Sequence, residues 1–400
     1  MKDYINQHRV ERDRLLGLPY IEREGLENAR KHLKNDLIKV ISGPRRAGKS
    51  VFALSILNGQ NFAYVNFDDE GLTKLLTLGN YDTLIDILKE VYPSFDFILF
   101  DEIQNLENWE LFLNKLQRRG HNLVVTGSNA QLLSGEWATA LTGRTIEMEV
   151  WPFSYQEYLK VKKMGTVNEY LQIGGYPEVV IKSLDRLAYT KGLMDSILIK
   201  DVTGRYQINR QQLLFDLNRY LLTQFTNEIS FSNLAKTFGL TSANTIQKFM
   251  GYLQNPYLYL LLDRFHSKPK LRITTPKKLY LVDTSFAPLG ISADTGRLLE
   301  NAAFLSLLRK SYKLNSDLYS YKTINGKEID FVYRKGYAID GLVQICLDLT
   351  NPKTLSREIS ALNEAGAELS CKNKVIVTIN EVKNLSATHG IEIIKASDWL

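Results

Sequence analysis

The sequence contains little cysteine and no long apolar run. Two cysteines, Cys346 and Cys371, occur in 400 residues, too few for a disulfide framework or a zinc cluster built on cysteine. The most apolar run, YLYLLL from Tyr257 to Leu262, is too short to cross a bilayer. The first residues, MKDYINQHRVERDRLL, are charged and have no apolar centre, which excludes an ordinary secretory signal. We therefore expect a cytoplasmic protein without a membrane partner.

The chain also lacks internal repeats and low-complexity linkers, although 400 residues are too many for a single ordinary core. Its 44% hydrophobic and 24% charged residues are typical of globular proteins. The net charge is +6 and the pI about 8.9. This mild excess of basic residues is compatible with a nucleic-acid partner but does not establish one.

Strand-like and helix-like segments alternate in the first part of the chain. Apolar runs rich in β-branched residues occur in LIKVISG, NFAYVNFDDE, FDFILFDEIQN and HNLVVTGSNA, with helical patterns between them. Such alternation predicts a doubly wound α/β fold with a parallel sheet. After Trp151 the pattern is helical to about Tyr206, apart from a break at IGGYPEVV. Mixed α/β patterning returns after Asp283.

Residues GPRRAGKS, from Gly43 to Ser50, fit the P-loop pattern GxxxxGK[ST]. The backbone N–H groups of such a loop surround phosphates, and the following helix adds its positive end. We expect Lys49 to reach the β- and γ-phosphates of ATP and the Ser50 hydroxyl to hold Mg²⁺. A chance match is the alternative, and the flanking strand and helix argue against it. The expected nucleotide-binding residues are Gly43, Pro44, Arg45, Arg46, Ala47, Gly48, Lys49, Ser50 and Val51.

Two acids follow a buried strand in FILFDE, about fifty residues after the P-loop. Ligands of open α/β sheets bind at the carboxyl ends of the strands. We expect Asp101 to hold the Mg²⁺ water shell and Glu102 to orient and polarise the attacking water. The pair favours hydrolysis over nucleotide binding alone, and the alternative is two ordinary acids at a strand end.

Two further positions are candidates for contact with the γ-phosphate. The fourth strand ends in Thr126-Gly-Ser128-Asn129, where a polar side chain would sense that phosphate, and a plain Asn/Ser turn is the alternative. Arg144 precedes another strand with alternating apolar residues. In a ring or dimer it would serve as an arginine finger for a neighbour, and a structural or surface arginine is the alternative.

Several motifs occur in a characteristic order: GPRRAGKS, FILFDE, VVTGSNAQLLSGE, LTGR, WPFSYQEYL and GGYPEVV. With them the chain resembles a family of archaeal and bacterial AAA-type P-loop ATPases that carry a C-terminal domain of unknown function. KDVTGRY, KKLYLVDTSFA and RLLENAAFLSLLR fit it as well, so the resemblance covers nearly the whole chain. It implies the roles given above for Lys49, Ser50, Asp101 and Glu102. It also makes Ser128 or Asn129 a sensor candidate and Arg144 a finger candidate.

A helix-turn-helix pattern occurs in LAKTFGLTSANTIQKFMGYL, with Gly239 in the turn and Thr241 or Ser242 as a helix cap. The stretch from Arg264 to Lys278 then contains six Lys or Arg and no acid. This order predicts a winged helix with a basic hairpin that contacts DNA phosphates. A protein contact or a lid extension is the alternative. The candidate DNA-contacting residues are Asn244, Gln247, Lys248, Arg264, Lys268, Lys270 and Arg272.

The C-terminal part has a helix with Glu300, a strand with Asp330 and then the strand IDGLVQICLDL. This layout resembles the restriction-endonuclease-like fold, in which acids hold Mg²⁺ and a lysine assists the nucleophile. Gln344 and Cys346 stand where that pattern requires an acid and a lysine, and Asp348 lies two residues further on. We therefore expect a degenerate nuclease-like domain, with Cys346 as a buried apolar residue.

These patterns predict an α/β protein with a parallel-sheet P-loop NTPase domain of AAA type. We expect a Mg²⁺-dependent ATP hydrolase that uses ATP, forms a homo-oligomer, a ring included, and remodels or moves along DNA. The alternatives are a nucleotide-gated signalling or scaffold protein whose C-terminal half binds a protein, and an ATP-controlled nuclease. The predicted segments are a P-loop domain with a helical leader at 1–155, a helical lid at 156–206, a winged-helix segment at 207–290 and the nuclease-like domain at 291–400.

Overall fold

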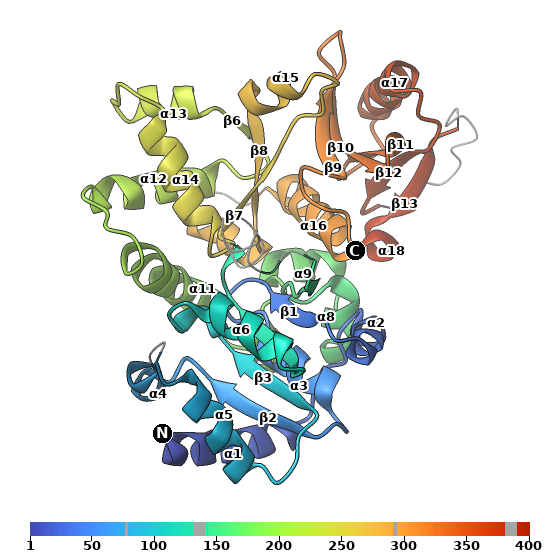
Figure 1. Ribbon diagram of the computed structural model, residues 1–400. Coiled ribbons are helices and arrows are strands. Elements are labelled where there is room, and N and C mark those ends of the chain that lie inside the picture. Colours follow the sequence, from blue (N-terminus) through green and yellow to red (C-terminus); the bar gives the residue numbers. More distant parts are fainter. Residues whose placement is uncertain (77–78, 131–140, 142, 291–293, 381–389) are drawn as a thin grey trace. The chain divides into compact units, whose positions relative to one another are not determined.

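The computed structural model describes residues 1–76, 79–130, 141, 143–290, 294–380 and 390–400 (Figure 1). Its contacts divide the chain into two units. The first contains Met1–Pro152 and the short segment Asn255–Tyr257, and the second contains Phe153–Gln254 and Leu258–Leu400. The QLLSGE part of one family motif, residues 131–136, lies outside the described residues.

The first unit is built on a parallel sheet. Among the described residues the strand order is β2-β3-β4-β1-β5, and each neighbouring pair is parallel. The predicted parallel α/β fold is confirmed. The strands are β1 (Ile38–Ser42), β2 (Phe62–Asn66), β3 (Phe97–Asp101), β4 (Asn122–Gly127) and β5 (Thr145–Glu149).

Helices cover both faces of this sheet (Figure 1). Successive residues of a strand point to opposite faces, so Phe100 belongs to one apolar core and Leu99 to the other. The first core receives side chains from α1, α4, α5 and α6, and the second from α2 and α3. The bounds are α1 (Lys2–Leu16), α2 (Leu26–Lys31), α3 (Lys49–Leu57), α4 (Glu70–Leu75), α5 (Tyr81–Val91) and α6 (Trp109–Arg118).

The strand order brings three functional segments to one edge. β4 lies between β1, which leads into the P-loop, and β3, which ends in the acids. The carboxyl ends of parallel strands share one edge of a sheet. Residues that follow β1, β3 and β4 therefore face a common space.

The second unit begins with short helices whose starts are encoded locally. α8 and α9 each begin with a capping box, formed by Ser154 with Glu157 and by Thr166 with Glu169. The expected break at IGGYPEVV separates α9 from α10, which has a proline at its first turn. The helices are α8 (Tyr155–Val161), α9 (Val167–Ile173), α10 (Pro177–Lys182), α11 (Arg186–Ser196), continued by a π-helical stretch at Ile197–Thr203, and α12 (Gln211–Thr223).

A small antiparallel sheet follows, with strand order β6-β8-β7 among the described residues. The expected helix-turn-helix segment forms α13 and α14 between β6 and β7. The basic stretch Arg264–Lys278 lies between and at the edge of two strands, β7 and β8, that pair antiparallel, and the connection between them contains a short helix, α15. The elements are β6 (Glu228–Ile229), α13 (Phe231–Thr237), α14 (Asn244–Gln254), β7 (Tyr259–Leu262), α15 (Pro269–Thr274) and β8 (Lys277–Leu281).

The C-terminal part contains a mixed sheet of order β13-β12-β11-β10-β9 among the described residues. β9, β10 and β11 are antiparallel, and β11, β12 and β13 are parallel. The expected return to mixed α/β structure is confirmed. The elements are α16 (Thr295–Arg309), β9 (Leu318–Lys322), β10 (Glu328–Lys335), β11 (Ala338–Ile345), α17 (Pro352–Glu368), β12 (Lys374–Thr378), β13 (Glu392–Lys395) and α18 (Ala396–Trp399). In the part of the chain that is described, no helix has the length and apolarity to span a bilayer.

Candidate functional site

The P-loop backbone depends on its two glycines. Gly43 follows β1 with φ +143°, and a Cβ on it would lie 2.1 Å from the Val150 carbonyl oxygen. Gly48 has φ +95° and precedes α3 directly. A residue with a side chain would be strained at either position. Arg23, which lies outside the motif, also anchors the loop. It donates hydrogen bonds to the carbonyl oxygens of Ala47 and Trp151.

Lys49 is buried at the start of α3, with 3% of its side chain exposed. Its Nζ donates to the Pro44 carbonyl oxygen at 3.1 Å and lies 3.4 Å from Oε1 of Glu102. The P-loop lysine and the second acid of FILFDE, 53 positions apart in the sequence, are therefore brought together. Their ion pair is long and involves one carboxylate oxygen.

Asp101 is buried and accepts hydrogen bonds from three hydroxyl groups. Ser50 donates to Oδ1 at 2.8 Å, Thr126 donates to the same oxygen, and Tyr64 donates to Oδ2 at 3.2 Å. Burial and the charge of Glu102 raise the pKa of Asp101 to about 6, although the bonds from Thr126 and Ser50 oppose this. Carboxylate and hydroxyl oxygens are the ligands that Mg²⁺ prefers, so Asp101 and Ser50 fit that ion.

Glu102 is held by side chains that follow β3 and end β4. Gln104 donates from Nε2 both to Oε2 of Glu102 and, at 3.3 Å, to Oγ of Ser128. The Glu102 backbone N–H donates to Thr126 Oγ1 at 3.0 Å, and the residue has φ +50°. Burial alone would raise the pKa of Glu102, but Lys49 and Gln104 outweigh it and hold the pKa below its usual value. Glu102 is therefore a carboxylate at neutral pH.

The candidates for contact with the γ-phosphate lie at two different edges of the sheet: Ser128 and Asn129 at one, and Arg144 at the other. Ser128 is buried and contacts Gln104, and the half-buried Asn129 follows it at the carboxyl edge of the sheet. Arg144 precedes β5, whose Thr145 pairs with Ile38 at the start of β1. It lies at the amino edge, away from this chain's own P-loop, and donates to Asn114. Arg144 and the P-loop of the same chain therefore lie at opposite edges of the sheet.

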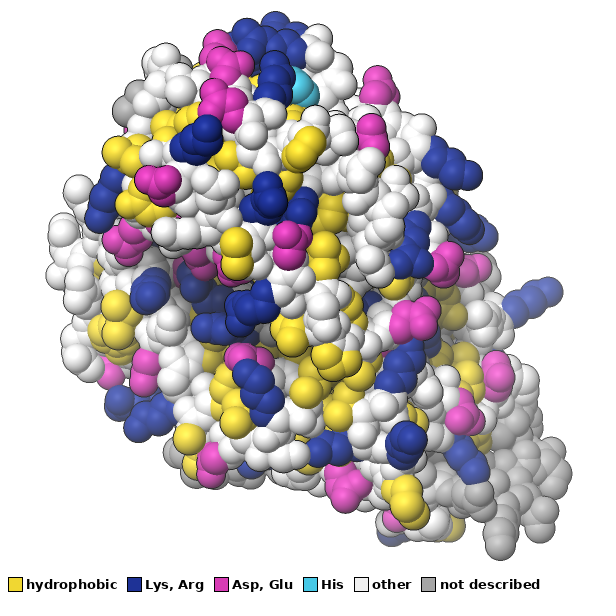
Figure 2. Space-filling view, turned by 90° about the horizontal axis from the view of Figure 1, so that it is seen from below, with side chains coloured by type: hydrophobic (Ala, Val, Ile, Leu, Met, Phe, Trp, Pro, Cys, Tyr) yellow, Lys and Arg dark blue, Asp and Glu magenta, His cyan; other side chains and the backbone are white. Residues whose placement is uncertain are grey.

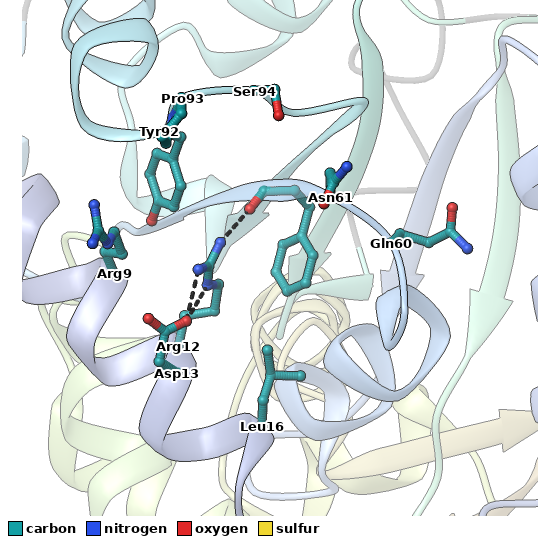
Figure 3. Close-up of a pocket in the computed structure, with 10 residues that line it drawn as sticks. Arg9, Arg12, Asp13, Leu16, Gln60, Asn61, Tyr92, Pro93 and Ser94 are labelled. Carbon is teal, nitrogen blue, oxygen red and sulfur yellow. Dashed lines mark hydrogen bonds and ion pairs between the residues drawn. The ribbon is translucent and has the colours of Figure 1, made fainter.

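A pocket of about 390 Å³ lies at the amino edge of the same sheet. Figure 3 shows Arg12 of α1 pointing into it, bonded to Asp13, with the Tyr92 ring to one side. The guanidinium also donates to the Phe62 carbonyl and lies 5.2 Å and 4.9 Å from the ring centres of Phe62 and Tyr92. These contacts are consistent with a packing role that fixes α1 to the sheet.

The candidate DNA-contacting residues separate into two groups. Arg264 forms a two-nitrogen contact with Glu228, and Arg272 lies over the rings of Phe265 and Tyr319, so both arginines have intramolecular partners. The remaining side chains are exposed on α14 and near α15: Asn244, Gln247, Lys248, Lys268 and Lys270.

The nuclease-like candidates are all placed in the second unit. Glu300 and Asp330 lie together with a third side chain, Lys278 of β8, between them. Gln344 is buried near Asp330, Cys346 packs in the apolar core of the mixed sheet, and Asp348 is exposed. Among the residues that the structure describes, no group of three or more His, Cys, Asp or Glu side chains is arranged to hold a metal ion.

Sequence reasoning missed Tyr64, Gln104 and Arg23 at the first site and Lys278 at the second. Gln104 lies two positions after Glu102, and this closeness in the sequence could have indicated that it contacts that acid. Tyr64 reaches Asp101 across neighbouring strands, which depends on strand order, whereas Lys278 reaches a helix and a strand of another sheet.

Comparison with protein families gives two matches. Residues 35–159 match the model of an AAA domain. Residues 164–295 match the model of a domain of unknown function, DUF8612.

Two relatives align with nearly the whole chain. The uncharacterized protein MJ1544 of Methanocaldococcus jannaschii is 32% identical, and the alignment covers 90% of this chain and 88% of that protein. An uncharacterized protein of Haemophilus influenzae is 29% identical, covering 91% and 94%. A solved structure, the Walker-type ATPase PABY2304 of Pyrococcus abyssi, is 16% identical with a TM-score of 0.47, covering 69% of this chain and 99% of that one.

Proposed function

Because the chain belongs to a family of AAA-type ATPases with a C-terminal domain of unknown function, we propose that it hydrolyses ATP in a Mg²⁺-dependent reaction. The observation that carries the proposal is the convergence of Lys49, Glu102 and the Ser50–Asp101 hydrogen bond at one edge of the sheet. Each belongs to a motif that the sequence predicts for phosphate chemistry.

The residues support a division of roles. The P-loop amides bind the phosphates, and Lys49 exchanges its long contact with Glu102 for phosphate oxygens. Glu102 is then free to accept a proton from the attacking water, and its lowered pKa keeps it in the basic form. Ser50 and Asp101 would hold Mg²⁺, which would neutralise phosphate charge when bound. We assign the response to the γ-phosphate to Ser128 or Asn129, which end β4 and follow it.

The decisive experiment compares steady-state ATP hydrolysis by the wild type, Lys49→Ala and Glu102→Gln. We expect Lys49→Ala to lose both nucleotide binding and turnover, and Glu102→Gln to bind nucleotide and lose turnover. A Lys49→Ala protein that hydrolyses ATP at the wild-type rate would refute the proposal.

We further propose DNA as the target that this activity remodels or moves along. The support is the order α12, β6, α13, α14, β7, β8, which has the connectivity of a winged helix, and the exposed side chains on α14 and α15. Arg264 is paired with Glu228 and Arg272 lies over two rings, so we assign the phosphate contacts to the exposed Lys248, whose ammonium lies over the Tyr252 ring at 5.8 Å, and to Lys268 and Lys270. On the face shown in Figure 2, Lys and Arg side chains are interspersed with Asp and Glu.

The DNA proposal is tested by measuring ATP turnover with single-stranded, duplex and branched DNA at near-physiological salt. We expect one form to stimulate turnover and the triple change of Lys248, Lys268 and Lys270 to Ala to abolish the stimulation. Each lysine removed from a phosphate lowers the salt dependence of binding by about one unit of slope. Alanine at the exposed Lys163 and Lys335 is the matched control.

Turnover that depends on Glu102 but ignores every DNA would favour the other candidate, a nucleotide-gated switch that binds a protein.

The position of Arg144 at the amino edge supports a homo-oligomer in which this residue serves a neighbouring copy. Mixing Lys49→Ala chains with Arg144→Ala chains tests that role. Recovered turnover in the mixture supports it, and no recovery opposes it.

A further inference from the structure

A second buried lysine lies among carboxylates in the second unit. Nζ of Lys278, on β8, is 3.0 Å from Oε1 of Glu300 on α16 and 2.7 Å from Oδ1 of Asp330 on β10. The three side chains are only 7%, 15% and 10% exposed. We call this group the Lys278 centre. Its members come from two segments that the sequence predicts to be separate domains.

Other groups occupy the carboxylate oxygens of this centre as well. The Tyr280 hydroxyl donates to Oε1 of Glu300 at 2.7 Å, and the Ile345 backbone N–H donates to Oδ2 of Asp330 at 2.9 Å. A metal ion bound between the two acids would have to displace Lys278 from the oxygens that it contacts. These hydrogen bonds therefore describe a filled centre.

The side chain at position 344 fits this arrangement as an amide. Its Oε1 accepts from the Asp330 backbone N–H at 3.4 Å, and its amide side chain also hydrogen-bonds to Glu358 of α17. Glu358 is paired with Arg357 at 2.6 Å. A carboxylate at Gln344 would stand between two acids, Asp330 and Glu358, and could not donate to either of them.

The charges of the cluster are balanced by the chain itself. Three carboxylates, Glu300, Asp330 and Glu358, stand beside two cations, Lys278 and Arg357. Burial would lower the pKa of Lys278, but Asp330 and Glu300 raise it, so the lysine keeps its charge. Burial raises the pKa of Glu300, and the ammonium of Lys278 opposes that rise.

From this geometry we propose that Lys278 takes the place of a divalent cation at the point where Glu300 and Asp330 converge. The Lys278 centre is a metal-free ionic connection that joins the three-stranded sheet to the mixed sheet. It does not cut nucleic acid. The absence of an acid and a lysine at positions 344 and 346 follows, because the cation that the two acids require is supplied by β8.

The proposal predicts a latent metal site that appears when the lysine is removed. In an Asp101→Asn background, which removes the carboxylate expected to bind Mg²⁺ at the P-loop, Lys278→Met leaves two adjacent carboxylates without their cation. We expect a lower thermal midpoint in chelator and recovery on addition of Mn²⁺. We also expect this double variant to bind Mn²⁺ at least about tenfold more tightly than the Asp101→Asn parent does. The electron spin resonance signal of free Mn²⁺ measures the binding.

Two variants in the same background make the result specific. Lys278→Arg keeps the positive charge and should behave like the parent towards Mn²⁺. Lys278→Met combined with Glu300→Gln and Asp330→Asn lacks both carboxylates that Lys278 contacts, so it should be insensitive to Mn²⁺ even if it is less stable.

The proposal is overturned if Mn²⁺ fails to raise the thermal midpoint of the Lys278→Met protein. It is overturned equally if the Asp101→Asn parent, with Lys278 intact, binds Mn²⁺ in a manner that Asp330→Asn abolishes. A third contrary result is Mn²⁺-dependent cleavage of DNA by the wild type that is lost in Asp330→Asn. None of these readouts requires ATP hydrolysis, so the test is independent of the proposed ATPase.

Discussion

Two buried lysines in this molecule face carboxylates, and their surroundings differ. Lys49 lies at the end of a glycine-containing loop, with a single ion pair of 3.4 Å to Glu102 and a bond to a backbone carbonyl. Lys278 lies on β8, between β6 and β7, with ion pairs of 3.0 Å and 2.7 Å to two acids. The side chains are similarly buried, 3% and 7% exposed.

The difference indicates which lysine is free to change partners. Removing one partner from a buried ion pair is costly because it leaves an uncompensated charge. Lys49 has one long ion pair, to Glu102, so its transfer to an incoming phosphate breaks only that ion pair. Lys278 has two short pairs on a strand that is hydrogen-bonded on both sides, so its charge is committed to the fold. The same residue type thus serves ligand binding in one unit and structure in the other.

The largest expected effect separates the two lysines by activity. We expect Lys49→Ala to lower kcat/KM for ATP by about 10³-fold or more, equivalent to about 4 kcal/mol. Lys278→Arg keeps the ion pairs and should leave kcat/KM within about twofold. Steady-state kinetics of the folded variants, with folding checked by circular dichroism, measures this. Equal losses in the two variants would contradict the comparison.

Stability should divide the lysines in the opposite sense. Lys278→Met breaks a buried network and should lower the free energy of unfolding by about 3–5 kcal/mol. Lys49→Met should cost less, about 1 kcal/mol, because one long ion pair and one hydrogen bond are lost. Urea unfolding, followed with a probe in each of the two units, gives the loss in the free energy of unfolding for both variants. A larger loss for Lys49→Met than for Lys278→Met would be inconsistent with the proposed roles.

A smaller effect concerns Gln104, the side chain that holds Glu102 against Ser128. Gln104→Ala should reduce kcat by about tenfold, as expected for loss of one positioning hydrogen bond, with little change in KM. Ser128→Ala removes the acceptor that Gln104 contacts and a side-chain hydrogen bond to Glu102, so it should reduce kcat in the same direction. A Gln104→Ala protein with altered KM and normal kcat would assign this residue to substrate binding.

The smallest effect is a proton exchange at Asp101. Burial raises the pKa of this carboxyl to about 6, so the ligand-free protein is stabilised by its protonation and loses that contribution as the pH rises through 6. Binding of Mg²⁺ with nucleotide requires the carboxylate and should release about half a proton at pH 6 and almost none at pH 8. Calorimetry in buffers of different ionisation enthalpy measures the release. Equal release at both pH values would argue against Asp101 as its source.

The parts of the site that the sequence predicts are those with local signals. GPRRAGKS directly follows its strand, and FILFDE contains its strand and both acids. The hydroxyl groups of Thr126 and Tyr64 have no such local signal as partners of Asp101. Thr126 and Tyr64 reach it only because β4 and β2 are the neighbours of β3, an order that periodicity does not encode.

Lys278 illustrates the same limit more strongly. In the sequence it is one of six basic residues in a stretch without acids, which favours a solvated surface. Its partners are 22 and 52 positions away, on a helix and on a strand of another sheet. Arg264 also has a distant partner, because the Glu228 that accepts its hydrogen bonds is 36 positions away in the sequence.

The three residues Asn255–Tyr257, which belong to the first unit, affect how that unit can be isolated. The chain enters or leaves the first unit at three peptide bonds: after Pro152, after Gln254 and after Tyr257. A protein truncated at residue 152 would lack the Asn255 carbonyl that accepts the Ala130 N–H at 2.8 Å and the Tyr257 ring that packs edge-on against Trp151. Expression of the ATPase half as a fragment therefore requires this tripeptide to be supplied, by a linker from residue 152 to residue 255 or as a separate peptide.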